Sequence, residues 1–169
     1  MPMVEAMLLE LAQEATATRR MLERVPNDQL AWKPHAKSMS LGQLALHVAA
    51  APGQIAALLR KDEVQVPDFA SRPSATSTAE AVETLDRSLE EAQRVLKGMD
   101  DQTAMSSWKL VRGDKHLFAA PKITVARSIL LNHWYHHRGQ LSVYLRLLDV
   151  PLPSVYGPSA DENPFAIEG

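Results

Sequence analysis

Apolar side chains recur every three or four residues in four separate stretches of the chain. This spacing places them on one face of an α-helix, with polar side chains on the other. The pattern therefore predicts four amphipathic helices. They cover residues 3–24, residues 40–60, residues 77–98 and a last stretch that begins at Pro121 or Thr124 and ends at about Leu148.

Two of these helices begin with the same local signal. Ser40 is followed three residues later by Gln43, and Ser77 by Glu80. In a capping box, the serine hydroxyl accepts a backbone hydrogen bond and the Gln or Glu side chain returns one to the serine. We therefore expect both helices to begin directly after these serines, and Gly98 to end the helix that starts after Ser77.

A proline lies inside the second predicted helix. Pro52 has no N–H, so it cannot donate to the carbonyl of Val48, one turn earlier. We expect a bend that opens space beside His47. A tolerated kink without any role is the alternative.

The remaining segments carry turn and breaker residues. Residues 61–76 are polar and predict a long surface connection, and Gly113-Asp114 between two apolar runs predicts a small hairpin before the last helix. Residues 154–169 predict an extended tail over the helices. The chain is thus expected to form one domain, residues 1–169, of the all-α class: a four-helix bundle with long connections.

Composition excludes several classes of function. The formal net charge is −2 and no basic block is present, so we expect no nucleic-acid partner. There is no cysteine, so a metal site must use nitrogen and oxygen ligands, and thiol chemistry needs a thiol from a cosubstrate. We also expect no secretory signal, no membrane span and a cytoplasmic location.

Three histidines lie on apolar helix faces. His133 and His137 are one turn apart, in a stripe with Leu130 and Leu141, and His47 lies on the inner face of the second helix. Three imidazoles form an incomplete shell around one divalent ion and leave positions for water or substrate. Nitrogen ligands suit zinc, nickel, iron, copper or manganese, and the pattern does not choose among them.

The alternative is that these are core histidines bonded to backbone carbonyls or to Tyr144. His136 lies about 100° around the helix from His137, so we exclude it as a ligand. Gln43 and Gln140 are candidates to orient a ligand imidazole. The pattern identifies no catalytic residue. His35 and His116 lie outside the predicted helices. We assign packing or interface roles to Trp134 and Tyr135, and an ion-pair or interface role to Arg138.

Three blocks of the sequence resemble the DinB family. They are Ser-Leu-Gly-Gln-Leu-Ala-Leu-His at 40–47, His-Trp-Tyr-His-His-Arg-Gly-Gln-Leu at 133–141 and Tyr-Gly-Pro-Ser-Ala-Asp-Glu at 156–162. The resemblance implies a four-helix fold in which His47, His133 and His137 bind a divalent metal, and it implies a homodimer. Relatives in the wider superfamily are transferases and isomerases that use low-molecular-weight thiols.

These observations support three hypotheses. The first is a metal-dependent enzyme, a thiol S-transferase or hydrolase, acting on a small molecule at an open coordination position. The second is a non-catalytic metal-binding stress-response protein, favoured if Asp161 or Glu162 completes the shell. The third is a metal-free bundle with structural histidines.

Overall fold

The structure is a computed structural model that describes residues 2–68 and 72–166. Residues 69–71 of the predicted surface connection and residues 167–169 of the predicted tail lie outside the described part. The described chain is mostly helical. Its helices are α1 (Glu5–Leu22), η1 (Asn27–Gln29), α2 (Leu41–Leu58), α3 (Thr78–Lys97), α4 (Asp101–Met105), α5 (Lys122–Val125), η2 (Ala126–Asn132) and α6 (His133–Leu147).

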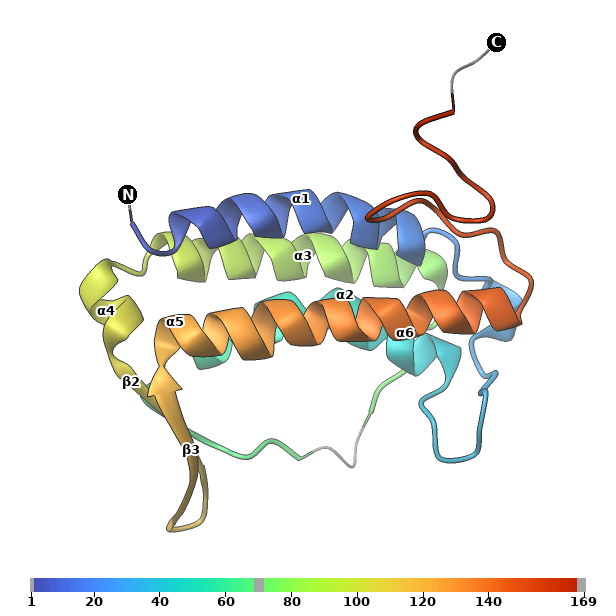
Figure 1. Cartoon of the computed structure of the whole chain (residues 1–169). Helices are drawn as coiled ribbons and strands as arrows, with labels where there is room; N and C mark the ends of the chain where they lie inside the picture. Colours follow the sequence, from blue (N-terminus) through green and yellow to red (C-terminus); the bar gives the residue numbers. More distant parts are fainter. Residues whose placement is uncertain (1, 69–71, 167–169) are drawn as a thin grey trace.

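The long helices lie side by side (Figure 1). Helix α2 packs against α3 and α6, and α1 packs against α3 and α6. Apolar faces of these helices form one core, in which Leu44, Leu85 and Leu141 are fully buried. Burial of these faces stabilises the helices more than their intrinsic propensities do.

The predicted all-α class is confirmed only in part: the described chain is mostly helical, but a small sheet with strand order β1-β2-β3 is also present. The expected hairpin is confirmed as β2 (Ser107–Arg112) and β3 (Lys115–Pro121), joined by a turn at Gly113 with φ +57°. The unexpected strand is β1 (Glu63–Gln65), which pairs in parallel with β2. Its three residues lie in the predicted surface connection, and so short a run has no detectable periodicity.

The last predicted helix is present but not uniform. Helical structure runs from Lys122 to Leu147, and its middle part, Ala126–Asn132, is a π-helix. A π-helix bonds each N–H to the carbonyl five residues earlier, so it rotates the next turns of helix relative to their position in a regular α-helix. Side-chain spacing did not predict it. It ends directly before His133.

The two predicted capping boxes have different outcomes. At Ser40 the box is complete: Gln43 N donates to Ser40 Oγ at 3.2 Å, and Ser40 N donates to Gln43 Oε1 at 2.9 Å. Ser77 caps α3, but the Glu80 carboxylate accepts hydrogen bonds from Thr76 and not from Ser77. Gly98 caps the C-terminal end of α3, as predicted.

Side chains from two other helices replace the hydrogen bonds that Pro52 disturbs. Trp134 Nε1, from α6, donates to the Val48 carbonyl at 2.8 Å. Ser88, from α3, accepts from Gly53 N at 2.7 Å and donates to the Ala50 carbonyl at 3.0 Å. The interruption of α2 is therefore satisfied by tertiary contacts, as buried backbone groups require.

The C-terminal tail is fastened across α1 and α6 by charged groups. Arg138 is buried and pairs with Glu14, with 2.6 Å between Nη1 and Oε2, and Tyr156 hydroxyl contacts both side chains. This confirms the ion-pair role predicted for Arg138. Asp161 pairs with Arg146, and Glu162 pairs with Arg20.

One helix contradicts the expectation that no segment approaches a membrane span. By length and composition, α2 is apolar enough to cross a bilayer. Most of its residues are nevertheless buried against neighbouring helices, as in the core helix of a globular domain. Its apolar character is accounted for by this packing.

Candidate metal centre

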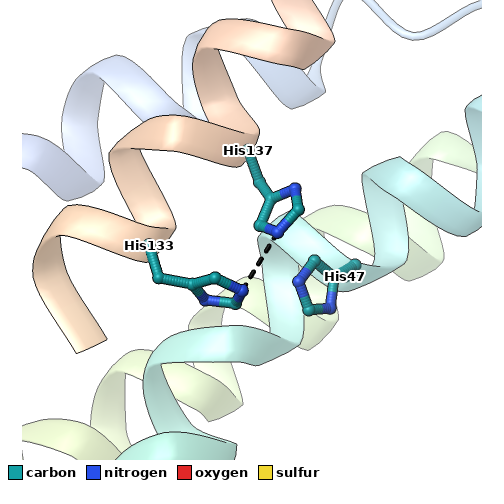
Figure 2. Close-up of side chains that lie close together, drawn as sticks. All are labelled: His47, His133 and His137. Carbon is teal, nitrogen blue, oxygen red and sulfur yellow. Dashed lines mark hydrogen bonds between the residues drawn. The ribbon is translucent and has the colours of Figure 1, made fainter. Parts of the chain in front are cut away.

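The structure brings His47, His133 and His137 together between α2 and α6. Figure 2 shows the three rings pointing toward one another, one from α2 and two from α6. One ring nitrogen of each lies within 4.8 Å of the other two. The Nε2 atoms of His133 and His137 are 3.0 Å apart, and the His47 ring centroid lies 4.4 Å from that of His137.

Neighbouring residues explain why the rings converge. His47 precedes Val48, and His133 precedes Trp134; the bond between Trp134 Nε1 and the Val48 carbonyl joins the two helices at this level. Trp134 is fully buried. The sequence pattern assigns it only a packing or interface role and misses this bond, although the unpaired carbonyl left by Pro52 is a usable signal.

Hydrogen bonds do not account for the three imidazoles as ordinary core histidines. His137 Nδ1 lies 2.7 Å from Gln140 Oε1, as predicted for Gln140. The Nδ1 atom of His133 is buried without a partner, and no described residue hydrogen-bonds to the His47 ring. Tyr144, the alternative partner, donates to the Met39 carbonyl. No ring is bonded to a backbone carbonyl within the described residues, which disfavours the structural alternative.

The environment keeps these rings uncharged at neutral pH. Burial, reinforced by the neighbouring histidines, lowers the pKa of His47 to about 4, and burial likewise lowers the pKa of His133 to about 4. Burial also lowers the pKa of His137, although the Gln140 hydrogen bond opposes this. Because only a neutral imidazole has a lone pair for a metal, the three rings have the charge state that metal binding requires.

The nitrogen positions suit a shared ion. Two nitrogens, each about 2.1 Å from one metal at angles between tetrahedral and octahedral, are about 3.0 to 3.4 Å apart. The His133 and His137 Nε2 atoms fall at the lower limit of this range. With Gln140 Oε1 as acceptor, the His137 proton lies on Nδ1 and its Nε2 lone pair faces the cluster.

Other candidate residues lie outside the cluster. His136 is exposed, and His35 and His116 lie on an exposed loop and on β3. Gln43 serves the capping box and donates to the Arg72 carbonyl, so its predicted role toward an imidazole is wrong. Asp161 and Glu162 pair with arginines and contribute no fourth ligand.

Comparisons with known proteins place the chain in a family. The chain is 23% identical to the uncharacterized protein YrdA of Bacillus subtilis (strain 168) over 88% of its own length and 85% of that protein. A crystal structure of a DinB-like protein from Bacillus cereus ATCC 10987 aligns with a TM-score of 0.68 at 22% identity, covering 88% of this chain and 95% of that one.

A second DinB-like protein, YjoA of Bacillus subtilis, aligns with a TM-score of 0.67 at 15% identity, covering 89% of this chain and 96% of that one. At these identities the two structures show a shared fold and nothing further. The model of the DinB family matches residues 1–164. The resemblance seen in the three sequence blocks is thereby confirmed, and the chain belongs to the DinB family.

Proposed function

We propose that this chain binds one divalent metal ion through His47, His133 and His137 and uses it as an enzyme on a small-molecule substrate. The observation that carries the proposal is the convergence of three neutral imidazoles, from two helices, on one point. The long helices would then act as a four-helix bundle of the DinB type, which holds metal ligands on facing helices.

The set of three ligands favours a catalytic metal site over a non-catalytic one. Three protein ligands leave coordination positions for water or substrate, whereas structural sites are usually closed by four. The acidic side chains that could have closed this shell, Asp161 and Glu162, are engaged with Arg146 and Arg20. A bound divalent ion supplies Lewis acidity, which can activate a water molecule or a thiol or polarise a carbonyl.

The residues of the chain would have separate roles. His47, His133 and His137 bind the ion as neutral ligands, and Gln140 fixes the His137 tautomer. Trp134 holds α6 against α2. Because the chain has no cysteine, a thiol S-transferase reaction would take its thiol from a low-molecular-weight cosubstrate. Hydrolysis is the other reaction that this ligand set supports. A homodimer and a cytoplasmic location stay predictions.

Elemental analysis tests the proposal directly. Protein purified without a polyhistidine tag or chelating resin should contain about one equivalent of zinc, nickel, iron, copper or manganese per chain. Dialysis against a chelator should remove it, and one equivalent should restore it. Absence of any metal, together with failure to take up these ions at micromolar concentration, would contradict the proposal.

Activity screens then separate the enzyme from the non-catalytic metal-binding protein. The metal-loaded chain is incubated with cellular thiols and electrophilic acceptors, and with ester and amide substrates. Turnover that is lost in His137→Ala but retained in His136→Ala supports a metal-dependent enzyme.

A further inference from the structure

The hairpin of β2 and β3 projects from the helices and carries exposed apolar side chains. Figure 1 shows it extending away from the long helices, with its turn at the far end. Every residue from Lys115 to Ala119 is exposed, including Leu117 and Phe118, which are 49% and 41% exposed. Neighbouring exposed apolar side chains on a projecting element are typical of a surface that contacts another molecule.

The hairpin has a defined shape, although it projects into solvent. Strand β1 pairs with β2, and Gly113 N at the turn donates to Gln65 Oε1, next to β1 in the sheet, at 3.0 Å. At the other end, the ring centroid of Phe118 lies 6.5 Å from that of the buried Trp108. A surface that is already ordered loses little conformational entropy when it binds.

The hairpin is basic, in contrast to the chain as a whole. Residues 107–121 contain three basic side chains and one acidic side chain, Asp114, so their formal charge is +2, whereas the whole chain carries −2. The basic side chains are Lys109, Arg112 and Lys115, which are exposed and form no ion pair within the described residues. The charge of the whole chain gives no sign of this local excess.

Charge and geometry select among the molecules that could cover the hairpin. A second copy of it is disfavoured, because two groups of charge +2 would repel each other. A peptide strand added along β3 is disfavoured by a break in register between Leu110 and Val111, which leaves Leu117 without a partner in β2. Such bulges disrupt the ladder and protect an edge from pairing. An anionic surface that accepts apolar side chains fits both properties.

We propose that the β2–β3 hairpin binds the surface of a lipid bilayer that contains anionic lipids, with Leu117 and Phe118 inserted among the headgroups. Each Lys or Arg near such a surface strengthens binding about fivefold, and Asp114 opposes this. Basic and apolar groups together give a weak, reversible attachment. The proposal is independent of the metal centre, so His137→Ala should bind bilayers as the wild-type chain does.

Sedimentation with lipid vesicles tests the basic side chains. The chain should bind vesicles of equal parts phosphatidylglycerol and phosphatidylcholine at least tenfold more tightly than pure phosphatidylcholine in 0.1 M NaCl. In 1 M NaCl this preference should be lost, because the screening length falls from about 10 Å to about 3 Å. The double variant Arg112→Gln with Lys115→Gln should bind at least tenfold more weakly. Arg87→Gln, at an exposed arginine of α3, should change binding less than about twofold.

A fluorescent label tests insertion of the apolar side chains. Because the chain has no cysteine, a cysteine introduced at one position can be labelled there alone. Leu117→Cys carrying an environment-sensitive fluorophore should brighten and shift to shorter wavelength with the anionic vesicles. Leu9→Cys, at an apolar residue of α1 that is 69% exposed, is the matched control and should not respond. Circular dichroism checks that the variants are folded.

Three results would overturn the proposal. The first is no binding of the wild-type chain to the anionic vesicles in 0.1 M NaCl. The second is equal binding by the wild-type chain and by the double variant at Arg112 and Lys115. The third is vesicle binding without a response of the label at position 117, or with an equal response at position 9. Binding without insertion would identify an electrostatic surface for acidic proteins in place of a bilayer contact.

Discussion

The indole Nε1 of Trp134 donates a hydrogen bond of 2.8 Å to the carbonyl of Val48, which Pro52 leaves without its intrahelical donor. The bond crosses from α6 to α2. Each partner is the chain neighbour of a histidine of the cluster, Val48 of His47 and Trp134 of His133. The carbonyl that Pro52 leaves without a donor in α2 thus accepts the hydrogen bond that holds α6 against α2.

Replacing Trp134 with Phe should lower both stability and metal affinity. The Val48 carbonyl would lose its donor in a buried place, at a cost of about 1 to 3 kcal/mol in the free energy of unfolding, measured by urea denaturation. Trp108→Phe is the matched control, since Trp108 Nε1 donates to the Leu58 carbonyl at the C-terminal end of α2, at 3.2 Å. It should reduce stability without reducing metal affinity. Equal effects of both variants on metal affinity would contradict the proposed coupling.

Single alanine substitutions of His47, His133 and His137 should each remove tight metal binding while the helical content remains. Losing one of three ligands should exceed the roughly 10- to 100-fold loss typical of groups outside the ligand shell. Metal content and circular dichroism provide the two measurements. The control is His136→Ala, which alters an exposed ring next to His137. Retention of stoichiometric metal in any of the three variants would reject that residue as a ligand.

The stability of the metal-free protein should fall as pH is lowered from 6.5 toward 5. In the folded chain the pKa of His47 and of His133 is about 4, so the unfolded chain, with ordinary histidines near 6.5, binds more protons in this window. The free energy of unfolding therefore rises with pH up to about 6.5 and is level above it. Urea denaturation at pH 5, 6 and 7 measures this slope, and His47→Gln should reduce it. A slope of zero in the wild-type protein would contradict the assigned pKa values.

The ion pair of Arg138 and Glu14 should be costly to break. Both side chains are buried, and Arg138 Nη1 also donates to the Glu14 carbonyl and to Thr18 Oγ1 at 3.2 Å. Arg138→Met leaves the Glu14 carboxylate buried without its main partner, so the free energy of unfolding should decrease by about 3 to 5 kcal/mol. Arg87→Met, at an exposed pair on α3, should have little effect. A similarly small effect for both variants would show that the buried pair of Arg138 and Glu14 does not stabilise the fold.

Two helical glycines should respond oppositely to alanine. At Gly53 an added Cβ would lie 2.8 Å from the Ser88 carbonyl oxygen, so Gly53→Ala should push α2 and α3 apart and cost about 1 to 3 kcal/mol. At Gly139 nothing lies within 4 Å, so Gly139→Ala should stabilise α6 by up to about 1 kcal/mol. Thermal denaturation of the two variants measures the difference. Destabilisation by Gly139→Ala would indicate that another molecule packs against that face of α6.

The sequence by itself determined the features that depend on neighbours along the chain. Helical periodicity placed the long helices and put His133 and His137 on one face, and the Ser40–Gln43 spacing located the start of α2. These are short-range relationships, set by helix geometry and by capping, so residues three or four apart are sufficient to detect them.

Only the tertiary structure decided the contacts between distant segments. In the tertiary structure His47 lies beside the other two rings, Trp134 donates to the Val48 carbonyl, and the Arg72 carbonyl accepts a hydrogen bond from Gln43 at the start of α2. The tertiary structure also added β1 to the hairpin, although its three residues looked like loop. Such contacts depend on how whole helices pack and on which buried polar groups need partners, and neither is encoded in a local pattern.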